Sequence, residues 1–280
     1  MSTIKLSLIR KNPLTIPVLI ADKWGLFKKY NVDVEIEILE DFKFQNNEDF
    51  CNGKVHAMVG DVTFFFYMLE REKKAVITSN LTRTISLVSG NNLPSNLEGI
   101  TVGVNRTGLF RLFLENDLKN IVPNAKIEWI NNTYDRMKAL EEGKIDALVA
   151  IEPFVTDVVE KGGQVIWSSR CSDKNMVMWA FDEEFYYNNK EEVKRFHIAL
   201  EEAHSIFNNS SEEEKMKLAI DCAGYNEVMA SRLREFTFEE QNNFRKEDFE
   251  LCQEWMYRNK EITRLYDVNS KMVNIFWNKK

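Results

Sequence analysis

The chain has 280 residues, and 44% of them are hydrophobic, so it can bury a substantial core and is not a disordered chain. Its formal net charge is −7 and it has no long basic run, so charge gives no support to nucleic-acid binding. No apolar run approaches the length of a membrane span, and we expect no membrane insertion.

Motifs for metal, cofactor and nucleophilic chemistry are missing from the sequence. None of the four cysteines is in a Cys-x-x-Cys pair, and none of the three histidines has metal-ligand spacing or a recognisable triad partner. The chain has no glycine-rich loop of the kind that binds nucleotide phosphates. We therefore expect neither a metal nor a cofactor.

The first residues favour a strand over a secretion signal. Ile4, Leu6 and Leu8 alternate with polar residues, whereas a signal peptide has a continuous apolar core. If Met1 is the native start, the expected location is the cytoplasm. If the chain is a mature form with a new start methionine, it is extracytoplasmic, and the sequence leaves both possibilities open.

The first part of the chain alternates predicted strands with predicted helices. Apolar patterning places strands at about 4–9, 32–38, 55–59, 75–79 and 84–88, and helices at 14–30, 43–53 and 61–69. Asp61 is the candidate N-cap of the third helix. We expect the last two strands to complete a first sheet.

A breaker cluster at 90–96 precedes a second series of the same kind. Strands are expected at 100–104, 125–130, 145–150 and 164–167, with helices between the first three and after the third. Another strand is expected at 176–181, and the chain is helical from Asp182 onward. Strands that alternate with helices predict largely parallel sheets.

Two segments ninety residues apart are nearly identical. Residues 53–59 read GKVHAMV and residues 143–149 read GKIDALV, and each lies between two helical segments. One repeat of this size predicts two related lobes, because a solenoid needs three or more copies. Two α/β lobes usually hold a ligand in the cleft between them.

The expected domain organisation is an inserted second lobe. Lobe one comprises 1–89 plus 176–280, and lobe two comprises 90–175. The helices at the end of the chain then pack back on lobe one, and the strand near 176–181 is the return crossing. Two crossing segments of this kind permit hinge closure.

Four segments, in the right order, resemble one protein family. They are residues 16–35 (IPVLIADKWGLFKKYNVDVE), 96–104 (NLEGITVGV), 140–153 and 190–196. They resemble the type II periplasmic-binding-protein superfamily, in the branch of aliphatic-sulfonate, taurine, nitrate and thiamine-pyrimidine proteins. The resemblance implies a two-lobed α/β periplasmic-binding-protein-like fold, with a ligand cleft between the lobes and a helical C-terminal segment.

One enzymatic branch of this family fits the sequence poorly. The resemblance implies that its pyrimidine synthases hold pyridoxal phosphate on a lysine just after the first repeat strand, where this chain reads GDVTF at 60–64. Their cysteine-rich iron motif is reduced here to Cys171. We therefore do not expect that chemistry.

Candidate ligand contacts in lobe one follow two predicted strands, because open α/β sheets bind ligands beyond the carboxyl ends of their strands. Arg10 and Asn12 follow the first strand and are either pocket residues or a surface loop. Asp61, Thr63 and Phe64 follow the repeat strand. Asp61 either only caps its helix or also accepts from an amine or ring N–H of a ligand.

Candidate contacts in lobe two suit an anion. Asn105, Arg106, Thr107 and Gly108 form a loop before a helix, and Arg106 could neutralise a carboxylate, sulfonate or phosphate. The alternative is a solvated arginine at a loop tip. Glu152 follows the second repeat strand and either faces the cleft or is a charge at its own helix N-terminus.

Three functional hypotheses remain open. The first is a non-enzymatic binding protein for a thiamine-type pyrimidine, or second a sulfonate or carboxylate, which passes its ligand to the membrane subunits of an ABC transporter. The second is a cytosolic biosynthetic enzyme, of the thiamine-pyrimidine or menaquinone-pathway kind, that uses Asp61 and Glu152. The third is a sensory effector domain, which needs a separate DNA-binding partner.

Overall fold

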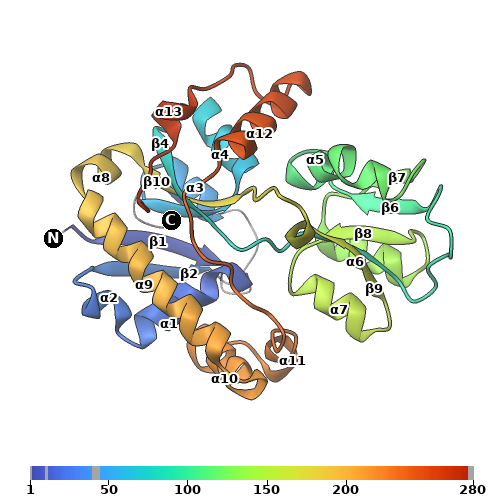
Figure 1. The fold of residues 1–280 in the computed structure, drawn as a ribbon, viewed down its shortest axis with the longest axis horizontal. Coiled ribbons are helices and arrows are strands. Elements are labelled where there is room, and N and C mark those ends of the chain that lie inside the picture. Colours follow the sequence, from blue (N-terminus) through green and yellow to red (C-terminus); the bar gives the residue numbers. More distant parts are fainter. Residues whose placement is uncertain (1, 10–11, 40–44, 277–280) are drawn as a thin grey trace. The chain divides into compact units, whose positions relative to one another are not determined.

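The chain forms two compact units, each built on one five-stranded sheet (Figure 1). The computed structural model describes residues 2–9, 12–39 and 45–276. Unit one comprises Met1–Thr82 and Asn175–Lys280, and unit two comprises Arg83–Lys174. No helix in the described part of the chain combines the length and apolar character needed to cross a membrane.

Unit one contains a mixed sheet in the order β2-β1-β3-β10-β4. Its strands are β1 (Ile4–Ile9), β2 (Val34–Leu39), β3 (Ala57–Asp61), β4 (Ala75–Asn80) and β10 (Val177–Asp182). β1 is parallel to β2 and β3, and β10 is antiparallel to both β3 and β4. The carboxyl ends of β1 to β4 therefore share one edge of the sheet.

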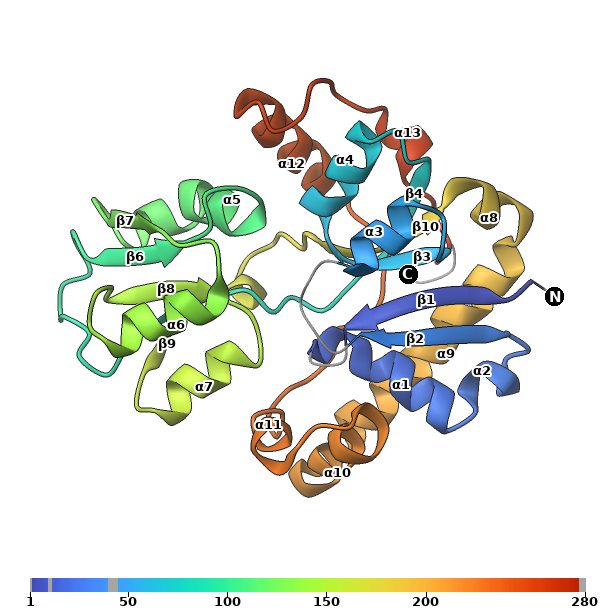
Figure 2. The ribbon, with the colours of Figure 1, turned by 180° about the vertical axis from the view of Figure 1, so that it is seen from behind.

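Helices cover both faces of this sheet, with α9 and α3 on opposite sides (Figures 1 and 2). The helices are η1 (Pro13–Thr15), α1 (Ile16–Lys23), α2 (Leu26–Lys29), α3 (Gln45–Cys51), α4 (Val62–Glu70), α8 (Glu183–Asn188), α9 (Lys190–Asn209), α10 (Glu212–Ala223), α11 (Glu227–Ser231), α12 (Lys246–Arg258) and α13 (Val268–Lys271). Phe196 of α9 packs against β10, with its ring centroid 5.3 Å from Trp179 and 5.7 Å from Phe181. The helices after Asp182 thus belong to unit one.

The helix expected at 14–30 is divided into three pieces. Gly25 has φ +68 and lies between α1 and α2. Glycine adopts this left-handed conformation without the steric penalty of a Cβ atom, so it ends one helix and redirects the chain into the next. Helical spacing of apolar residues continued through this position and did not reveal the break.

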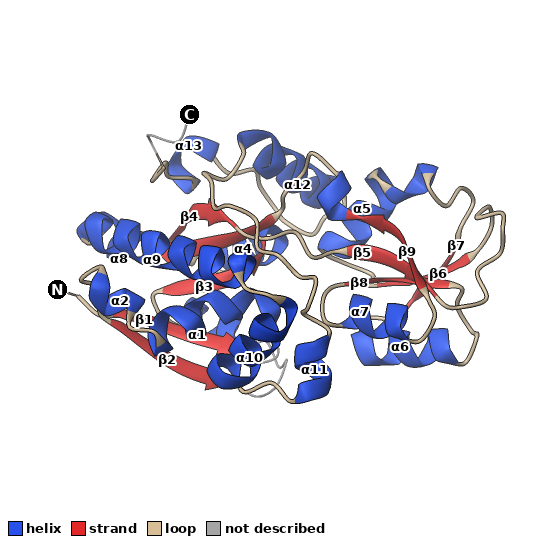
Figure 3. Cartoon of the chain, turned by 60° about the horizontal axis from the view of Figure 1, so that its bottom comes forward, coloured by secondary structure: helices blue, strands red, loops and turns tan. Residues whose placement is uncertain are grey.

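Unit two repeats the architecture on a smaller scale, in the order β7-β6-β8-β5-β9. Its elements are β5 (Ser86–Ser89), β6 (Thr101–Val104), α5 (Leu109–Asn116), η2 (Leu118–Asn120), β7 (Lys126–Trp129), α6 (Thr133–Glu141), β8 (Ala147–Ala150), α7 (Phe154–Glu160), β9 (Gln164–Ser168) and η3 (Ser169–Cys171). Helix α5 lies on one face of the sheet, and α6 and α7 lie on the other (Figure 3).

The sequence predicts that the strand at 84–88 belongs to the first sheet, and this prediction is wrong. The strand is β5, which lies between β8 and β9 in the second sheet and is antiparallel to both. Its four residues are all buried, and a short buried strand carries no pattern that says which sheet it joins. The lobe limits at 89/90 and 175/176 stay a prediction.

The internal repeat occupies the same position in both sheets. The repeat strands are β3 and β8, and each is the central strand between a parallel and an antiparallel neighbour. Gly53 and Gly143, with φ +74 and +66, follow the helix that precedes each repeat strand. Equivalent glycines therefore turn the chain into equivalent strands.

Candidate ligand-binding loops

Each unit presents several helix N-termini at one edge of its sheet. In unit one, β1 leads into η1 and β3 leads into α4; in unit two, β6, β7 and β8 lead into α5, α6 and α7. The first N–H groups of a helix lack partners within the helix and attract negative charge. The loops between these strands and helices are the candidate ligand-binding loops.

Asn12 caps the first turn after β1. Its side-chain oxygen accepts from the Leu14 N–H at 3.1 Å, and its carbonyl accepts from the Thr15 hydroxyl at 2.8 Å. The side chain is partly exposed, so a ligand contact stays a prediction. Arg10 lies outside the described residues.

Asp61 is the N-cap of α4. Its Oδ1 accepts from the Thr63 N–H at 2.9 Å, the Phe64 N–H at 3.3 Å and the Thr63 hydroxyl. Burial raises the pKa of Asp61 to about 6 against these hydrogen bonds, and the charge of Glu261 raises it further. The group remains partly exposed, so it can both cap its helix and accept from a ligand donor.

The neighbours of Asp61 differ in how they can serve a ligand. Thr63 is 1% exposed and its hydroxyl is bound to Asp61, which makes it a support for the carboxylate. In the run of three phenylalanines, Phe65 and Phe66 are buried in the core and Phe64 is partly exposed. Phe64 lies edge-on to Tyr67, with ring centroids 6.4 Å apart.

Sequence reasoning missed a second acidic group near Asp61. Glu261 accepts a 2.6 Å hydrogen bond from the Tyr67 hydroxyl. Burial raises the pKa of the Cys252 thiol, and the charges of Asp61 and Glu261 raise it further. Glu261 follows α12, which packs on α4. Only tertiary packing brings it here, and no local pattern could have identified it.

Arg106, at the edge of unit two, lies against an aromatic ring. Its guanidinium carbon is 5.5 Å from the ring centroid of Trp129, at the end of β7, which permits a cation–π interaction. Its N–H donates to the Asn131 side chain at 3.0 Å. Arg106 and Thr107 are both exposed, so their side chains are accessible to a ligand.

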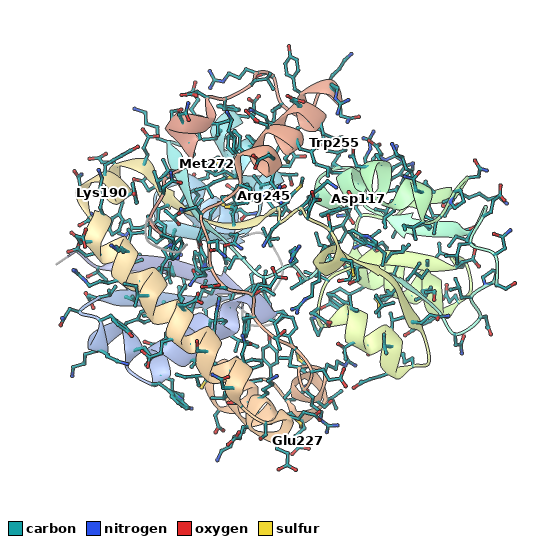
Figure 4. All side chains as sticks on the ribbon, in the orientation of Figure 1. Asp117, Lys190, Glu227, Arg245, Trp255 and Met272 are labelled. Carbon is teal, nitrogen blue, oxygen red and sulfur yellow. The ribbon has the colours of Figure 1, made fainter. Side chains whose placement is uncertain are left out.

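Gly108 opens α5 without a side-chain cap. Its φ of +77 is one that residues with a Cβ rarely adopt, and no side chain caps the helix. By contrast, Asn132 caps α6 through the Tyr134 N–H at 2.8 Å. The other end of α5 is followed by Asp117 (Figure 4). Its carboxylate pairs with the Lys174 ammonium at 2.7 Å, which holds that end of the helix.

Arg136 of α6 is a further residue that sequence reasoning missed. Its side chain is fully buried. Nη1 donates to the Asn105 side chain, to the Ile130 carbonyl at 2.7 Å and to the Asn131 carbonyl at 3.0 Å. Nη2 donates to the Thr133 hydroxyl at 2.9 Å. Burial lowers the pKa of Arg136 to about 10. It remains charged at neutral pH.

Glu152 is engaged with its own helix. Its Oε2 accepts from the Thr156 N–H at 3.2 Å and from the Thr156 hydroxyl at 2.8 Å. This is the helix N-terminal role that the sequence left open as an alternative. The side chain is partly exposed, and its contact with a ligand stays a prediction.

Within each unit, sheet topology brings the predicted loops to one edge. The loops with Asn12 and Asp61 follow neighbouring strands of unit one, and the loops with Asn105 and Glu152 follow neighbouring strands of unit two. A direct side-chain contact links the loop 105–108 to Arg136. Each unit therefore presents one group of candidate residues.

A surface cavity of about 440 Å³ lies elsewhere in unit two. It is lined by residues such as Gly90, Gly143 and Asp146, which lie where β5 ends and β8 begins, at the edge opposite the candidate loops. Its lysine, Lys161, pairs with Glu141 at 2.6 Å. Among the residues that the structure describes, no three His, Cys, Asp or Glu side chains are grouped to hold a metal ion.

Comparison of sequences identifies no relative. The chain matches no family model and no curated protein.

Comparison of structures identifies clear similarity of fold. The periplasmic aliphatic sulphonate binding protein SsuA of Escherichia coli is 13% identical, with a TM-score of 0.81 over 98% of this chain and 92% of that one. A zinc-bound ligand binding component of an ABC-type import system from Staphylococcus aureus is 10% identical, with a TM-score of 0.75 over 99% of both chains. The periplasmic nitrate-binding protein NrtA of Synechocystis is 14% identical, with a TM-score of 0.63 over 84% and 69%.

These similarities confirm the predicted fold class. The chain has the two-lobed periplasmic-binding-protein fold, with two mixed five-stranded sheets and flanking helices. At such low identity the comparison establishes the fold alone, because one fold can host many functions.

Proposed function

We propose that this protein is a solute-binding protein that captures a small polar or anionic metabolite through the loops at the carboxyl edges of its two sheets. One observation carries the proposal: each edge combines helix N-termini with a charged side chain, Asp61 in unit one and Arg106 in unit two. The fold of proteins described as binding sulphonate and nitrate supports the same function.

The charges at the two edges suggest what the ligand contains. Arg106 and the N-terminus of α5 suit a sulfonate or carboxylate. Asp61 suits an amine or ring N–H, which a thiamine-type pyrimidine provides. Both ligand classes therefore stay in the proposal. The structural neighbours described as binding sulphonate or nitrate favour the anionic class.

Partners and location follow from the same proposal. A solute-binding protein delivers its ligand to the membrane subunits of an ABC transporter and works outside the cytoplasm. The neighbours described as periplasmic or as parts of import systems support this. Fractionation of the native cells tests it: recovery of the protein only with cytoplasmic markers would contradict an extracytoplasmic role.

A ligand screen tests the proposed function. Purified protein is heated with thiamine-type pyrimidines, sulfonates, taurine, nitrate and short carboxylates, each with and without pyridoxal phosphate. A ligand at about a hundred times its dissociation constant stabilises the fold by roughly 2.7 kcal/mol. We expect hits from one chemical class, recovered unchanged by mass spectrometry. A screen with no hit contradicts the proposal.

The matched variants for this screen are Arg106→Gln and Lys138→Gln. Both remove one exposed positive charge from unit two, but Lys138 lies on α6, with 73% of its side chain exposed and Nζ 3.9 Å from Glu142. For an anionic hit, we expect Arg106→Gln to weaken binding by about tenfold and Lys138→Gln to leave it unchanged. A tenfold change in the dissociation constant corresponds to about 1.4 kcal/mol of binding free energy.

The rival is an enzyme on the same fold, and one observation favours it. A carboxyl group with a pKa of about 6, such as Asp61, is suited to proton transfer near neutral pH. Consumption of a hit, or a response only with pyridoxal phosphate, would replace the binding-protein proposal. The version that uses Asp61 and Glu152 requires that the double variant Asp61→Ala, Glu152→Ala lose turnover.

A further inference from the structure

Arg136 carries a buried positive charge, and its side chain forms no ion pair with a carboxylate among the residues that the structure describes. Its four hydrogen bonds go to neutral oxygens, and the hydrogen on Nε has no partner. Burial of an unpaired charge is strongly unfavourable. If the position had only a structural role, a neutral side chain would make the fold more stable.

The hydrogen bonds of Arg136 also orient the side chains in front of it. Arg136 donates to Oδ1 of Asn105, so the Asn105 amide must present its N–H₂ group in the other direction. The Asn131 Oδ1 accepts from the Arg106 N–H, which leaves the N–H₂ group of Asn131 as a donor as well. Two amide groups thus offer hydrogen-bond donors at this edge.

The first turn of α5 lies beside the same group. Asn105 begins the loop 105–108, which ends at the N-terminus of α5, where no described side chain caps the helix. The ring of Phe110, in that first turn, lies 5.4 Å from the guanidinium carbon of Arg136. Thr107 in the same loop adds an exposed hydroxyl. This group therefore offers a ligand several hydrogen-bond donors beside a positive charge.

We infer that Arg136 is a positioning residue for an oxyanion subsite, formed by the loop 105–108 and the first turn of α5. It holds the Asn105 amide with its donors outward, and its charge attracts a compact sulfonate, carboxylate or phosphate group. The inference rests on the proposed function, because the oxyanion is part of the captured ligand. It adds a residue from a different helix that sets the charge preference without touching the ligand.

Inorganic sulfate is the probe for this subsite. The full-length protein is titrated with sodium sulfate, and sodium chloride at matched ionic strength is the reference. We expect sulfate to raise the thermal midpoint of the wild type, Arg136→Gln to weaken sulfate binding at least about tenfold, and Lys138→Gln, two positions along the same helix, to leave it unchanged. Arg136→Lys keeps the charge but lacks the planar set of donors of a guanidinium, so we expect it to weaken sulfate binding less than Arg136→Gln does.

A second variant keeps the test decisive if Arg136→Gln fails to fold. Asn105→Asp places a carboxylate against the guanidinium, so we expect this variant to fold at least as stably as the wild type and to lose the sulfate response. Asn92→Asp adds the same charge at an exposed turn after β5, at the opposite edge, and we expect it to retain the response.

The outcomes separate this inference from the proposed function. No sulfate response in the wild type, or an unchanged response in Arg136→Gln and Asn105→Asp, overturns the subsite even if the ligand screen finds a hit. A sulfate response that depends on Arg136, together with a screen that yields no metabolite, supports the subsite and counts against the proposed function alone.

Discussion

At the scale of single residues, Asp61 combines a local role with a partly exposed position. It caps α4 through the Thr63 and Phe64 N–H groups, yet burial raises its pKa to about 6. The hydrogen bonds favour the charged form, and the partly apolar surroundings favour the neutral form. Because desolvation is the larger effect, the fold binds the proton of Asp61 more tightly than the unfolded chain does.

This balance predicts a pH-dependent effect of Asp61→Asn. Stability from the neutral carboxyl is fully present below its ordinary pKa of 3.8 and is lost as the pH rises through about 6. Asparagine cannot ionise but remains a good N-cap. We therefore expect Asp61→Asn to match the wild type near pH 4 and to be more stable at pH 7, as measured by urea unfolding.

The control for this prediction is Asp22→Asn, at an exposed position of α1. We expect it to change stability little at either pH. If Asp61→Asn gained no stability between pH 4 and pH 7 relative to the wild type, Asp61 would not be destabilised by burial, and its pKa would be set by capping alone.

At the scale of elements, His197 connects α9 to β4 and to the segment before α12. Its Nε2 lies 3.0 Å from the Thr78 hydroxyl and its Nδ1 lies 2.7 Å from the Gln241 Oε1. The Gln241 side chain also donates to the His197 carbonyl at 3.0 Å. The C-terminal segment is thus fixed to the helix that covers sheet one.

We expect His197→Leu to destabilise unit one, because Thr78 and Gln241 each lose a buried hydrogen bond, at about 1–3 kcal/mol for each group. Ile198→Ala, at an exposed position next along α9, is the control. Burial lowers the pKa of His197 to about 4, so its contribution is present above pH 6.5 and is lost as the pH falls towards 4. Urea unfolding at pH 7 measures the loss of stability in each variant, and unfolding at pH 4.5 measures how much of the His197 contribution remains. An equal loss of stability in His197→Leu and Ile198→Ala would contradict the prediction.

Gly163 shows how closely elements of unit two approach one another. A Cβ at this position would lie 2.3 Å from the Ser89 carbonyl oxygen and 2.9 Å from the Val158 carbonyl oxygen. Backbone atoms cannot move aside as side chains do, so the turn between α7 and β9 requires glycine here.

We therefore expect Gly163→Ala to destabilise unit two by about 1–3 kcal/mol, as overpacking generally does. The matched control is Gly60→Ala in β3, where the nearest atom is 3.8 Å from the added methyl group and belongs to a side chain. Thermal unfolding of both variants distinguishes them. Equal unfolding midpoints for the two variants would show that the turn before β9 can adjust to the added methyl group.

At the scale of the whole molecule, chain order and sheet order differ. β10, which follows unit two in the sequence, lies between β3 and β4 in the sheet of unit one. Unit two is one continuous segment with its own sheet and a buried cluster that includes Val88, Met137 and Leu148. The first unit therefore needs both ends of the chain, and the second needs only its own residues.

This difference predicts the behaviour of fragments. We expect Arg83–Lys174 expressed alone to fold and to unfold cooperatively, whereas 1–82 alone should not fold, because β4 pairs with β10 and α9 covers the core. Circular dichroism during thermal unfolding measures both fragments. Non-cooperative melting of the 83–174 fragment would show that the second unit depends on the first.

Several features could be predicted from the sequence because they depend on local patterns. Alternating apolar residues located β1 and β2, and Asp61 was found as an N-cap. The near-identity of 53–59 and 143–149 identified two equivalent central strands. These features are encoded within short windows, where side-chain period and capping act directly on the backbone.

The sequence by itself thus determined the two α/β lobes and which loops follow the strands, since periodicity and an internal repeat are properties of the chain. The resemblance of four segments to a known family implied the fold class. Only the tertiary structure decided that β5 joins the second sheet and that Arg136 lies buried behind Asn105. A short buried strand has no preferred partner until the sheets assemble. A lone arginine in a polar helix resembles a solvated one until packing removes the water around it.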